Sequence, residues 1–304
     1  MIEPRLNYVT CPGAAAGKAG EQHRMAYWEW NQTGDAGHPH IMLCVHGLTR
    51  QGRDFDVLAQ ELSQYGRVIC PDVVGRGRSD WLADPMAYGV PQYAIDMVLL
   101  LQQLHTQAPI QMLDWLGTSM GGLIGMAVAS NPALPLPVRV RKLLLNDVGP
   151  VLEWPALQRI AQYVGQAPLF HSQQEAADAL RVLAAGFGPH TDAQWLALSK
   201  PMLQATEDGH WKLHYDPQIA VPMRGMTQEQ SLHGQSVLWQ LYDAIEAQTL
   251  LVRGADSDLI TQASAHEMAQ RGPRARYIEL EGVGHAPTFV ADDQVAIAKD
   301  FFVG

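Results

Sequence analysis

The sequence predicts an α/β fold, in which a mostly parallel, doubly wound sheet is covered by helices on both faces. Short apolar stretches typical of buried strands alternate along most of the chain with segments of helical periodicity. Strands that alternate with helices favour parallel pairing, because each crossover helix has to pack on the sheet. A chain of 304 residues, 47% of them hydrophobic, is long enough to bury the core that such a sheet requires.

The elements of this core follow one another along the chain. Alternating residues at 7–10 and 25–30 predict an antiparallel pair of strands at one edge of the sheet. Apolar or alternating stretches predict further strands at 41–45, 68–70, 110–116, 143–145, 250–254 and 277–280. Helical periodicity predicts helices at 55–65, 92–105 and 294–302.

Residues 151–235 break this alternation. Helical periods without intervening buried strands follow one another there, at 154–164, 174–185 and 192–198. Residues 209–215 alternate instead and predict a short extended piece. We therefore expect residues 1–150 and 236–304 to form the α/β core, with residues 151–235 as an inserted, mainly helical unit.

A serine between glycines stands at a predicted strand-to-helix junction. The stretch Gly117-Thr118-Ser119-Met120-Gly121 follows an apolar strand and precedes a helical segment. This G-x-S-x-G pattern is typical of a nucleophile elbow, a turn so sharp that larger residues would collide with the neighbouring backbone. Its position predicts that Ser119 is the nucleophile of an enzyme.

A histidine and several aspartates follow other predicted strands. His285 lies in a glycine-rich loop after one strand, Asp256 and Asp258 come directly after another, and Asp147 follows a third. Carboxyl ends of parallel strands meet at one edge of a sheet, so a serine, an acid and a histidine can converge there. The pattern predicts a catalytic triad in which His285 is the base.

A second glycine-containing loop can supply donors for a developing oxyanion. The predicted strand at 41–45 runs directly into His46, Gly47 and Leu48. Acyl transfer through a serine needs backbone N–H groups, one after the nucleophile and one from such an earlier loop. We assign these donors to Met120 and Leu48, and we expect His46 to be structural.

These features together resemble the α/β-hydrolase superfamily. The matching segments are residues 46–47, 72–80, 117–121, 254–258 and 284–285. The resemblance implies the α/β-hydrolase fold, a Ser-Asp-His triad, and a mostly helical cap over the active site.

The triad acid departs from the usual pattern of that family. The aspartate usually stands three residues after the strand-ending glycine, where this chain has Ser257. Asp258 fits best, because the apolar pair at 259–260 then matches the positions that commonly follow the acid. Asp258 is therefore the predicted acid, with Asp256 as the next alternative and Asp147 as the third.

The resemblance implies a serine hydrolase that acts on a small carboxylic ester, lactone or thioester through an acyl-enzyme. In that reaction His285 takes the proton of Ser119 while the acid orients the imidazole. One alternative is a carbon–carbon bond hydrolase of a ring-fission diketone, although such relatives usually carry Asn before the nucleophile, where this chain has Thr118. Another is a non-catalytic small-molecule binding protein on the same scaffold.

Aromatic residues of the inserted unit are candidates for lining an apolar substrate pocket. Trp154 comes soon after the chain leaves a predicted strand at the expected active-site edge. We therefore predict that Trp154 binds substrate, with packing inside the cap as the alternative. Phe170, Trp195 and Trp211 are further candidates, most of which we expect to be ordinary core.

Composition and motifs argue against several other classes of protein. The formal net charge is −10 and no basic stripe is present, which disfavours binding to nucleic acid or anionic membranes. Segment 75–80 begins like a dinucleotide fingerprint, but no helix starts there before Pro85. The twelve histidines form no H-E-x-x-H motif, so we expect neither a metal nor a cofactor.

Cysteine usage and hydropathy bear on the compartment. Cys11, Cys44 and Cys70 form an odd set, which suggests free thiols in a reducing environment. The first residues lack the apolar segment of a signal peptide, and no stretch is long and apolar enough to span a membrane. We expect a cytoplasmic protein with a small-molecule substrate, while the sequence leaves its oligomeric state open.

Overall fold

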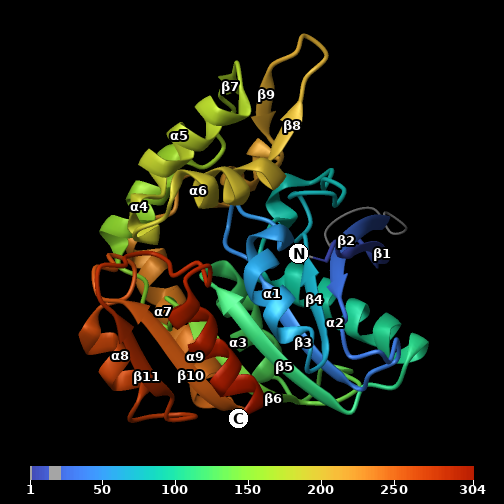
Figure 1. The fold of residues 1–304 in the computed structure, drawn as a ribbon. Coiled ribbons are helices and arrows are strands. Elements are labelled where there is room, and N and C mark those ends of the chain that lie inside the picture. Colours follow the sequence, from blue (N-terminus) through green and yellow to red (C-terminus); the bar gives the residue numbers. More distant parts are fainter. Residues whose placement is uncertain (1, 14–21) are drawn as a thin grey trace.

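The main sheet carries the fold of this chain. The computed structural model describes residues 2–13 and 22–304. Within these residues the main sheet has eight strands in the order β1-β2-β4-β3-β5-β6-β10-β11 (Figure 1). Strands β4 to β11 of this order pair in parallel, whereas β1 and β2 form an antiparallel hairpin that joins β4 in antiparallel fashion. The predicted α/β fold and the antiparallel pair at its edge are confirmed.

The strands of this sheet coincide closely with the apolar stretches of the sequence. Their bounds are β1 Arg5–Pro12, β2 Gln22–Trp30, β3 His40–Val45, β4 Arg67–Pro71, β5 Met112–Thr118, β6 Val140–Asn146, β10 Gln248–Gly254 and β11 Arg276–Leu280. Every residue of β3 and β4 is buried, as expected for parallel strands that are covered on both faces.

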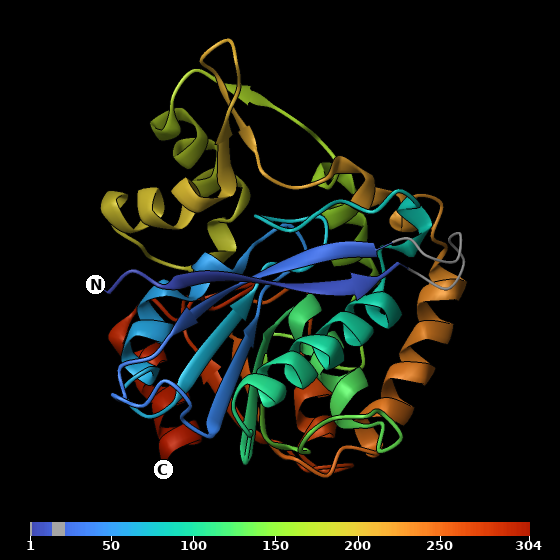
Figure 2. The same ribbon diagram turned by 90° about the vertical axis from the view of Figure 1, so that its right-hand side faces the viewer.

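Helices cover both faces of the sheet (Figures 1 and 2). On one face, α1 (Asp56–Leu62) and α9 (Asp292–Val303) pack against Met42 and Cys44 of β3. On the other face, the cluster that contains Leu43 also contains residues of several helices, among them α2 Val90–Gln107, α3 Met120–Ala129 and α8 Gln262–Met268. Successive β3 side chains therefore enter different cores, in keeping with the twofold period of a strand.

Between β6 and β10 the chain forms a second layer, which we call the upper layer (residues 154–223). Its helices and strands are α4 Trp154–Tyr163, β7 Leu169–Phe170, α5 Gln173–Leu183, α6 Asp192–Ser199, β8 Leu203–Ala205 and β9 Trp211–Leu213. The strands form a small sheet in the order β7-β9-β8, so the predicted extended piece at 209–215 contains β9. Both ribbon views place this layer beyond one edge of the main sheet.

The remaining elements connect these layers. Helix α7 (Gln228–Asp243) follows the upper layer and runs along the core, so one helix crosses the predicted boundary at residue 235 (Figure 2). Single turns of 3-10 helix lie at Gly52–Phe55, Pro85–Ala87, Ala185–Phe187 and Lys200–Met202, and a longer one lies at Pro217–Met223. The division into an α/β core and an inserted unit stays a prediction.

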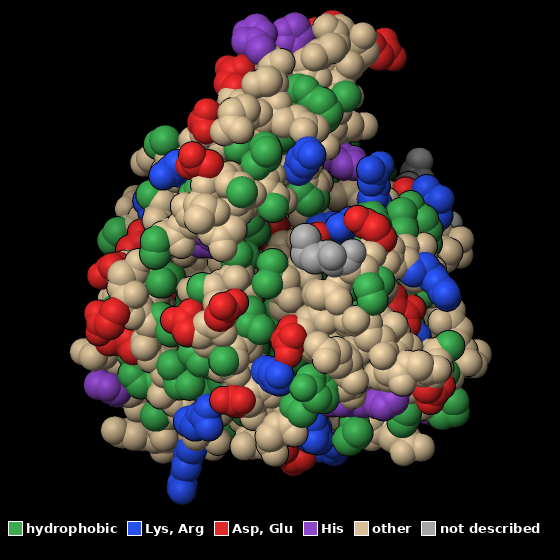
Figure 3. Space-filling view, in the orientation of Figure 1, with side chains coloured by type: hydrophobic (Ala, Val, Ile, Leu, Met, Phe, Trp, Pro, Cys, Tyr) green, Lys and Arg blue, Asp and Glu red, His purple; other side chains and the backbone are tan. Residues whose placement is uncertain are grey.

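The surface and the helix lengths bear on partners. On the face shown in Figure 3, acidic and basic side chains are interspersed, and neither sign gathers into one large patch. Within the described residues, no helix combines the length and the apolar character needed to span a bilayer.

The three cysteines Cys11, Cys44 and Cys70 are all buried free thiols.

Candidate active site

Ser119 occupies a sharp turn between β5 and α3. Its φ of 51° lies in the left-handed region, which costs a residue with a Cβ atom conformational energy and is typical of functional sites. A Cβ atom on Gly117 would overlap the backbone of Gly121, and one on Gly121 would overlap the carbonyl of Val45. The glycines on either side of the serine are therefore required for the turn to close.

Ser119 is the first member of a hydrogen-bonded chain of three side chains. The Nε2 atom of His285 lies 3.0 Å from Ser119 Oγ, and its Nδ1 atom lies 2.7 Å from Asp147 Oδ2. The side chain of His285 is 14% exposed and that of Asp147 is fully buried. This geometry has the order of nucleophile, base and orienting carboxylate that acyl transfer through a serine requires.

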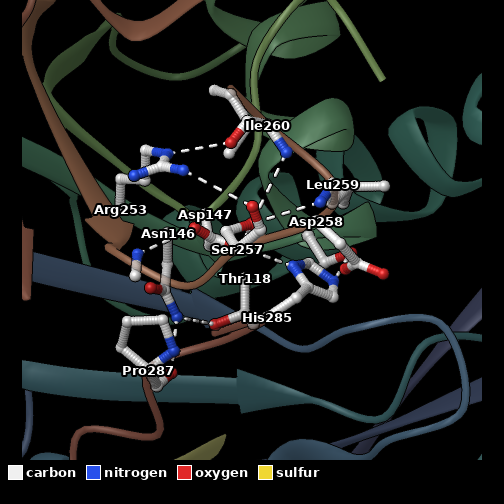
Figure 4. Close-up of polar contacts among 12 residues, drawn as sticks. Thr118, Asn146, Asp147, Arg253, Ser257, Asp258, Leu259, Ile260, His285 and Pro287 are labelled. Carbon is white, nitrogen blue, oxygen red and sulfur yellow. Dashed lines mark hydrogen bonds and ion pairs between the residues drawn. The ribbon is translucent and has the colours of Figure 1, made fainter. Parts of the chain in front are cut away.

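Asp147 is held by further donors from the loop after β10 (Figure 4). Its Oδ1 atom accepts a hydrogen bond of 2.9 Å from the Gly254 N–H, and Oδ2 accepts one of 2.6 Å from the Ser257 hydroxyl. Because a carboxylate loses its hydration on burial, such donors offset the cost of keeping it inside the protein. Together with His285, they fix the position of both carboxylate oxygens.

The expectation that Asp258 is the acid beside His285 is wrong in this structure. Asp258 forms a two-pronged ion pair with Arg159, with distances of 2.7 Å (Nε to Oδ2) and 2.8 Å (Nη2 to Oδ1), and its side chain is 49% exposed. Asp256 is exposed as well. The loop directs Ser257 inward toward Asp147, so its neighbours on either side face outward. The third alternative of the sequence analysis, Asp147, is the carboxylate that contacts His285.

Asn146 connects the three loops that carry the triad. Its Nδ2 atom donates to Thr118 Oγ1 at 2.9 Å and to the Pro287 carbonyl at 2.8 Å. The backbone carbonyl of Asn146 accepts from the Ser119 N–H at 3.0 Å. These bonds tie the end of β6 to the residues beside the nucleophile and the base. The sequence analysis did not single out Asn146, although it directly precedes an aspartate at a strand end.

The backbone N–H groups of Leu48 and Met120 are the expected oxyanion donors. Both line the cavity that contains Ser119. Among the described residues, no acceptor is found for the backbone N–H of either one. Two free N–H groups beside the nucleophile can hold the oxygen of a tetrahedral intermediate.

The buried Arg76 supports both of these residues, and the sequence analysis missed it. Its Nε atom donates to the Leu48 carbonyl at 2.8 Å, and its Nη2 atom lies 3.6 Å from the Met120 sulfur. Nη1 donates to the Val74 carbonyl and the Tyr93 hydroxyl. A fully buried arginine within segment 75–80 therefore holds the loop at residues 46–48 in place.

His46 is structural, as expected. Its ring bonds to the Gly47 carbonyl at 2.7 Å, and its Nε2 atom accepts from the Val73 N–H at 3.0 Å. Burial lowers the pKa of His46 to about 3, because the charged imidazolium would lose its hydration. A neutral ring with both nitrogens engaged holds the loop at residues 46–48 and cannot act as a base.

Two cavities meet at Ser119. The larger, of about 340 Å³, is lined mostly by aliphatic side chains such as Leu123, Val148 and Leu157. The smaller, of about 100 Å³, is lined by His285 together with Arg50, Arg159, Tyr163 and apolar groups. Both share Leu48, Ser119 and Ile160. Ile160 belongs to α4, so the upper layer forms part of the wall around the nucleophile.

Trp154 does not line either of these cavities, contrary to the expectation. It lines a neighbouring depression of about 420 Å³, which shares Leu157, Met223 and Met226 with the larger cavity. Trp154 is the first residue of α4, whereas Ile160, which lies almost two turns further along the helix, lines both cavities at Ser119.

The other aromatic candidates of the inserted unit pack within the upper layer. Phe170 is buried in a small cluster against which Trp211 packs. Trp195 stacks on Phe187 with ring centroids 6.1 Å apart. The contacts of these three aromatic residues agree with the expectation of ordinary core.

One group of side chains outside this site has the residue types of a metal site. Cys11, His23 and Asp96 are buried with candidate ligand atoms within 4.8 Å of one another. His23 Nε2 bonds to Asp96 at 3.0 Å, and Gln92 donates to the other carboxylate oxygen, so the group ties the β1-β2 hairpin to α2. Burial raises the pKa of the Cys11 thiol, which disfavours the thiolate that a metal would need. The expectation of no metal stays a prediction.

Comparison with known proteins places the chain in a family. The model of the alpha/beta hydrolase family matches residues 42–298. The chain belongs to this family. A 3-hydroxybutyrate-oligomer hydrolase from Cupriavidus necator is 48% identical over 304 residues, which cover 99% of this chain and 98% of the relative.

More distant relatives of this α/β hydrolase agree. An esterase from Mycobacterium tuberculosis is 26% identical over 81% of this chain and 76% of its own length. The crystal structure of an alpha/beta hydrolase from Novosphingobium aromaticivorans superimposes with a TM-score of 0.81, at 33% identity, and covers 99% of this chain and 98% of that one. The chain is therefore a hydrolase, and its relatives support ester hydrolysis.

Proposed function

We propose that this α/β hydrolase cleaves short oligomers of 3-hydroxybutyrate through a serine acyl-enzyme. The observation that carries the mechanism is the hydrogen-bonded chain from Ser119 through His285 to Asp147 at the meeting point of two cavities. The substrate class is supported by the full-length relative of 48% identity, which is a 3-hydroxybutyrate-oligomer hydrolase.

The first half of the reaction forms the acyl-enzyme. Nε2 of His285 takes the proton of Ser119 Oγ as this oxygen attacks the ester carbonyl. The amides of Leu48 and Met120 hold the resulting oxyanion, and Asp147 stabilises the imidazolium. His285 then gives its proton to the leaving alkoxide, so the ester C–O bond breaks and a free hydroxyl leaves.

The second half regenerates the enzyme. A water molecule takes the place of the alcohol, loses a proton to His285 and attacks the acyl carbon. Collapse of the second tetrahedral intermediate returns the proton to Ser119 and releases a carboxylic acid. Each cycle consumes one water and yields one acid and one alcohol, which for this substrate are both hydroxy acids.

The shape of the site supports a small substrate with apolar branches. The larger cavity of about 340 Å³ is lined mainly by aliphatic side chains, which suit the methyl groups and methylenes of such an oligomer. The alternative of carbon–carbon bond cleavage has no comparable support, because the relatives described above are an oligomer hydrolase and an esterase.

The test is whether the enzyme releases acid from the synthetic dimer and trimer of 3-hydroxybutyrate in a way that depends on Ser119. Titration at constant pH measures the rate of acid release. Ser119→Ala should fold normally and lose roughly 10⁴-fold or more in kcat. Ser236→Ala, an exposed serine of α7, is the matched control and should keep full activity. Retention of more than about a tenth of the rate by Ser119→Ala would remove this serine from the mechanism. Hydrolysis of simple esters without hydrolysis of the oligomers would contradict the substrate class.

A further inference from the structure

The two cavities at Ser119 differ in charge. The smaller is lined by Arg50, Arg159 and His285, and its described lining residues include no Asp or Glu. The larger is lined by no charged side chain among the described residues. The two ends of a bound ester therefore lie in different environments. Only the smaller cavity has basic side chains that can attract an anion.

His285 decides which end of the ester occupies which cavity. Its side chain lines the smaller cavity and not the larger one. Because the imidazolium has to protonate the leaving alkoxide, the leaving group lies on the side of His285. The leaving alcohol thus occupies the smaller cavity, and the acyl part occupies the larger, aliphatic one.

Of the two arginines in the smaller cavity, Arg159 has donors to spare. A guanidinium has five N–H donors, and Asp258 engages only Nε and Nη2 of Arg159, from a side chain that is 49% exposed. Arg159 and Tyr163 both line the cavity, and hydrogen bonding to Asp258 and then to Tyr163 raises the pKa of the Arg159 guanidinium. No hydrogen bond to Nη1 of Arg159 is found among the described residues.

Arg50 is occupied on all sides by comparison. Asp54 engages its Nε and Nη2 atoms at 2.6 and 2.8 Å, and Nη2 also donates to the Leu198 carbonyl. Its Nη1 atom contacts the sulfur of Met202. The guanidinium of Arg50 therefore stabilises the wall of the smaller cavity, whereas that of Arg159 still has N–H groups that can donate to a bound ligand.

We propose that Arg159 binds the free carboxylate of the leaving hydroxy acid, so that the enzyme cuts the ester bond nearest to the carboxyl end of its substrate. In a 3-hydroxy acid, a single methylene group separates the carboxylate from the carbon that bears the leaving oxygen, which suits a cavity of about 100 Å³. Charge-assisted hydrogen bonds from a guanidinium to a carboxylate are among the stronger polar contacts in proteins. Asp258 is then the residue that positions Arg159. This inference rests on the proposed function.

The test compares two substrates that differ only in this carboxylate, the free-acid dimer of 3-hydroxybutyrate and its methyl ester. Arg159→Gln should raise KM for the free acid by about 10- to 100-fold, the value expected for loss of a hydrogen-bonded charge partner. The same variant should change kcat/KM for the methyl ester by less than about threefold. Arg159→Lys should lie between the wild type and Arg159→Gln, because it keeps the charge and loses the planar fork.

Arg181→Gln is the matched control, because Arg181 lies in α5, pairs with Asp192 on the surface and lines neither cavity. It should treat both substrates as the wild type does. Thermal unfolding of each variant verifies that it is folded. If Arg159→Gln does not fold, the comparison between the two substrates is made with Arg159→Lys.

The order of product release gives an independent readout. From a trimer labelled at its hydroxyl end, the wild type should first release an unlabelled monomer, and Arg159→Gln should lose this preference. Equal effects of Arg159→Gln on the acid and the methyl ester, or no effect on either, would overturn the carboxylate subsite while leaving the proposed function intact. A wild-type enzyme that cleaves neither substrate would overturn the proposed function and this inference with it.

Discussion

The loops that follow β6 and β10 both carry an aspartate at the same edge of the sheet, and they use it in opposite ways. Asp147, at the end of β6, is fully buried and bonds to His285, Gly254 and Ser257. Asp258, after β10, is half exposed and pairs with Arg159. The difference teaches that the number of fixed donors around a carboxylate, more than its distance from a motif glycine, selects the partner of the histidine.

The order of the strands explains why either loop could hold the acid. β6 lies between β5, which leads to Ser119, and β10, which in turn neighbours β11 and the loop of His285. The Asp147 N–H donates to the Val252 carbonyl at 2.8 Å, so the ends of β6 and β10 are directly joined. We therefore expect a carboxylate on either loop to be able to approach His285.

Removal of the buried carboxylate should have the largest effect. Asp147→Asn is expected to lower kcat on a neutral ester such as p-nitrophenyl butyrate by roughly 10⁴-fold, because His285 loses the acceptor that fixes its tautomer. Steady-state kinetics measure the loss, and circular dichroism with thermal unfolding verifies the fold.

Asp258→Asn is the matched control for that variant. On the same neutral ester it should stay within about threefold of the wild type, since an exposed ion pair contributes little to stability and none of its atoms contacts His285. If Asp258→Asn were the crippling substitution and Asp147→Asn stayed active, the comparison between the two loops would be reversed.

A carboxylate placed on the other loop should restore part of the activity. Ser257 Oγ lies 2.6 Å from the oxygen of Asp147 that accepts from His285, so a longer acidic side chain at this position can approach the ring. The double variant Asp147→Asn/Ser257→Asp should regain about 10-fold or more over Asp147→Asn alone. A double variant no more active than the single one would show that only the β6 loop can hold the acid.

Loss of the Ser257 hydroxyl should lower activity less than loss of the Asp147 carboxylate does. Ser257→Ala removes one donor to Asp147 and leaves the Gly254 N–H and His285 in place. A hydrogen bond to a charged group contributes about 1.5–3 kcal/mol, so kcat should fall by about 10- to 100-fold with little change in KM. The control Ser236→Ala should show no change. An unaltered kcat in Ser257→Ala would mean that this hydroxyl does not hold the acid in place.

The fold could be predicted from the sequence because its signals are local. Apolar stretches at 41–45 and 68–70 correspond to β3 and β4, and the alternation at 25–30 lies in β2. The small sheet β7-β9-β8 was mostly missed, since strands of two or three residues in the upper layer are too short to show a period.

The candidate site also contains residues that local motifs predict and one residue that they do not. Ser119, His285, Leu48 and Met120 follow from motifs in which glycines fix the backbone nearby. The acid does not, because the choice between three aspartates depends on which side chain turns inward at the junction of two strands. Ser257 in the usual place of the acid was a usable signal that an aspartate from another strand had to serve.

The expectation for Trp154 was wrong, and Arg76 was missed, for a related reason. The direction of Trp154 depends on the rotation of α4 about its axis, which its first turn alone does not determine. Arg76 lies in a glycine-rich segment that the sequence analysis considered only as a dinucleotide fingerprint, and only the folded chain shows it buried beside Leu48 and Met120.

The hydrogen bond between His285 and Asp147 is the central claim, and proton NMR at low temperature tests it most directly. A proton shared between an imidazole Nδ1 and a carboxylate is strongly deshielded. His23 and His40 also contact carboxylates and can give similar signals. The signal of His285 is therefore assigned as the one that is lost in His285→Gln. We predict that this signal disappears or moves far upfield in Asp147→Asn and stays in place in Asp258→Asn. Its persistence in Asp147→Asn together with its loss in Asp258→Asn would contradict the account.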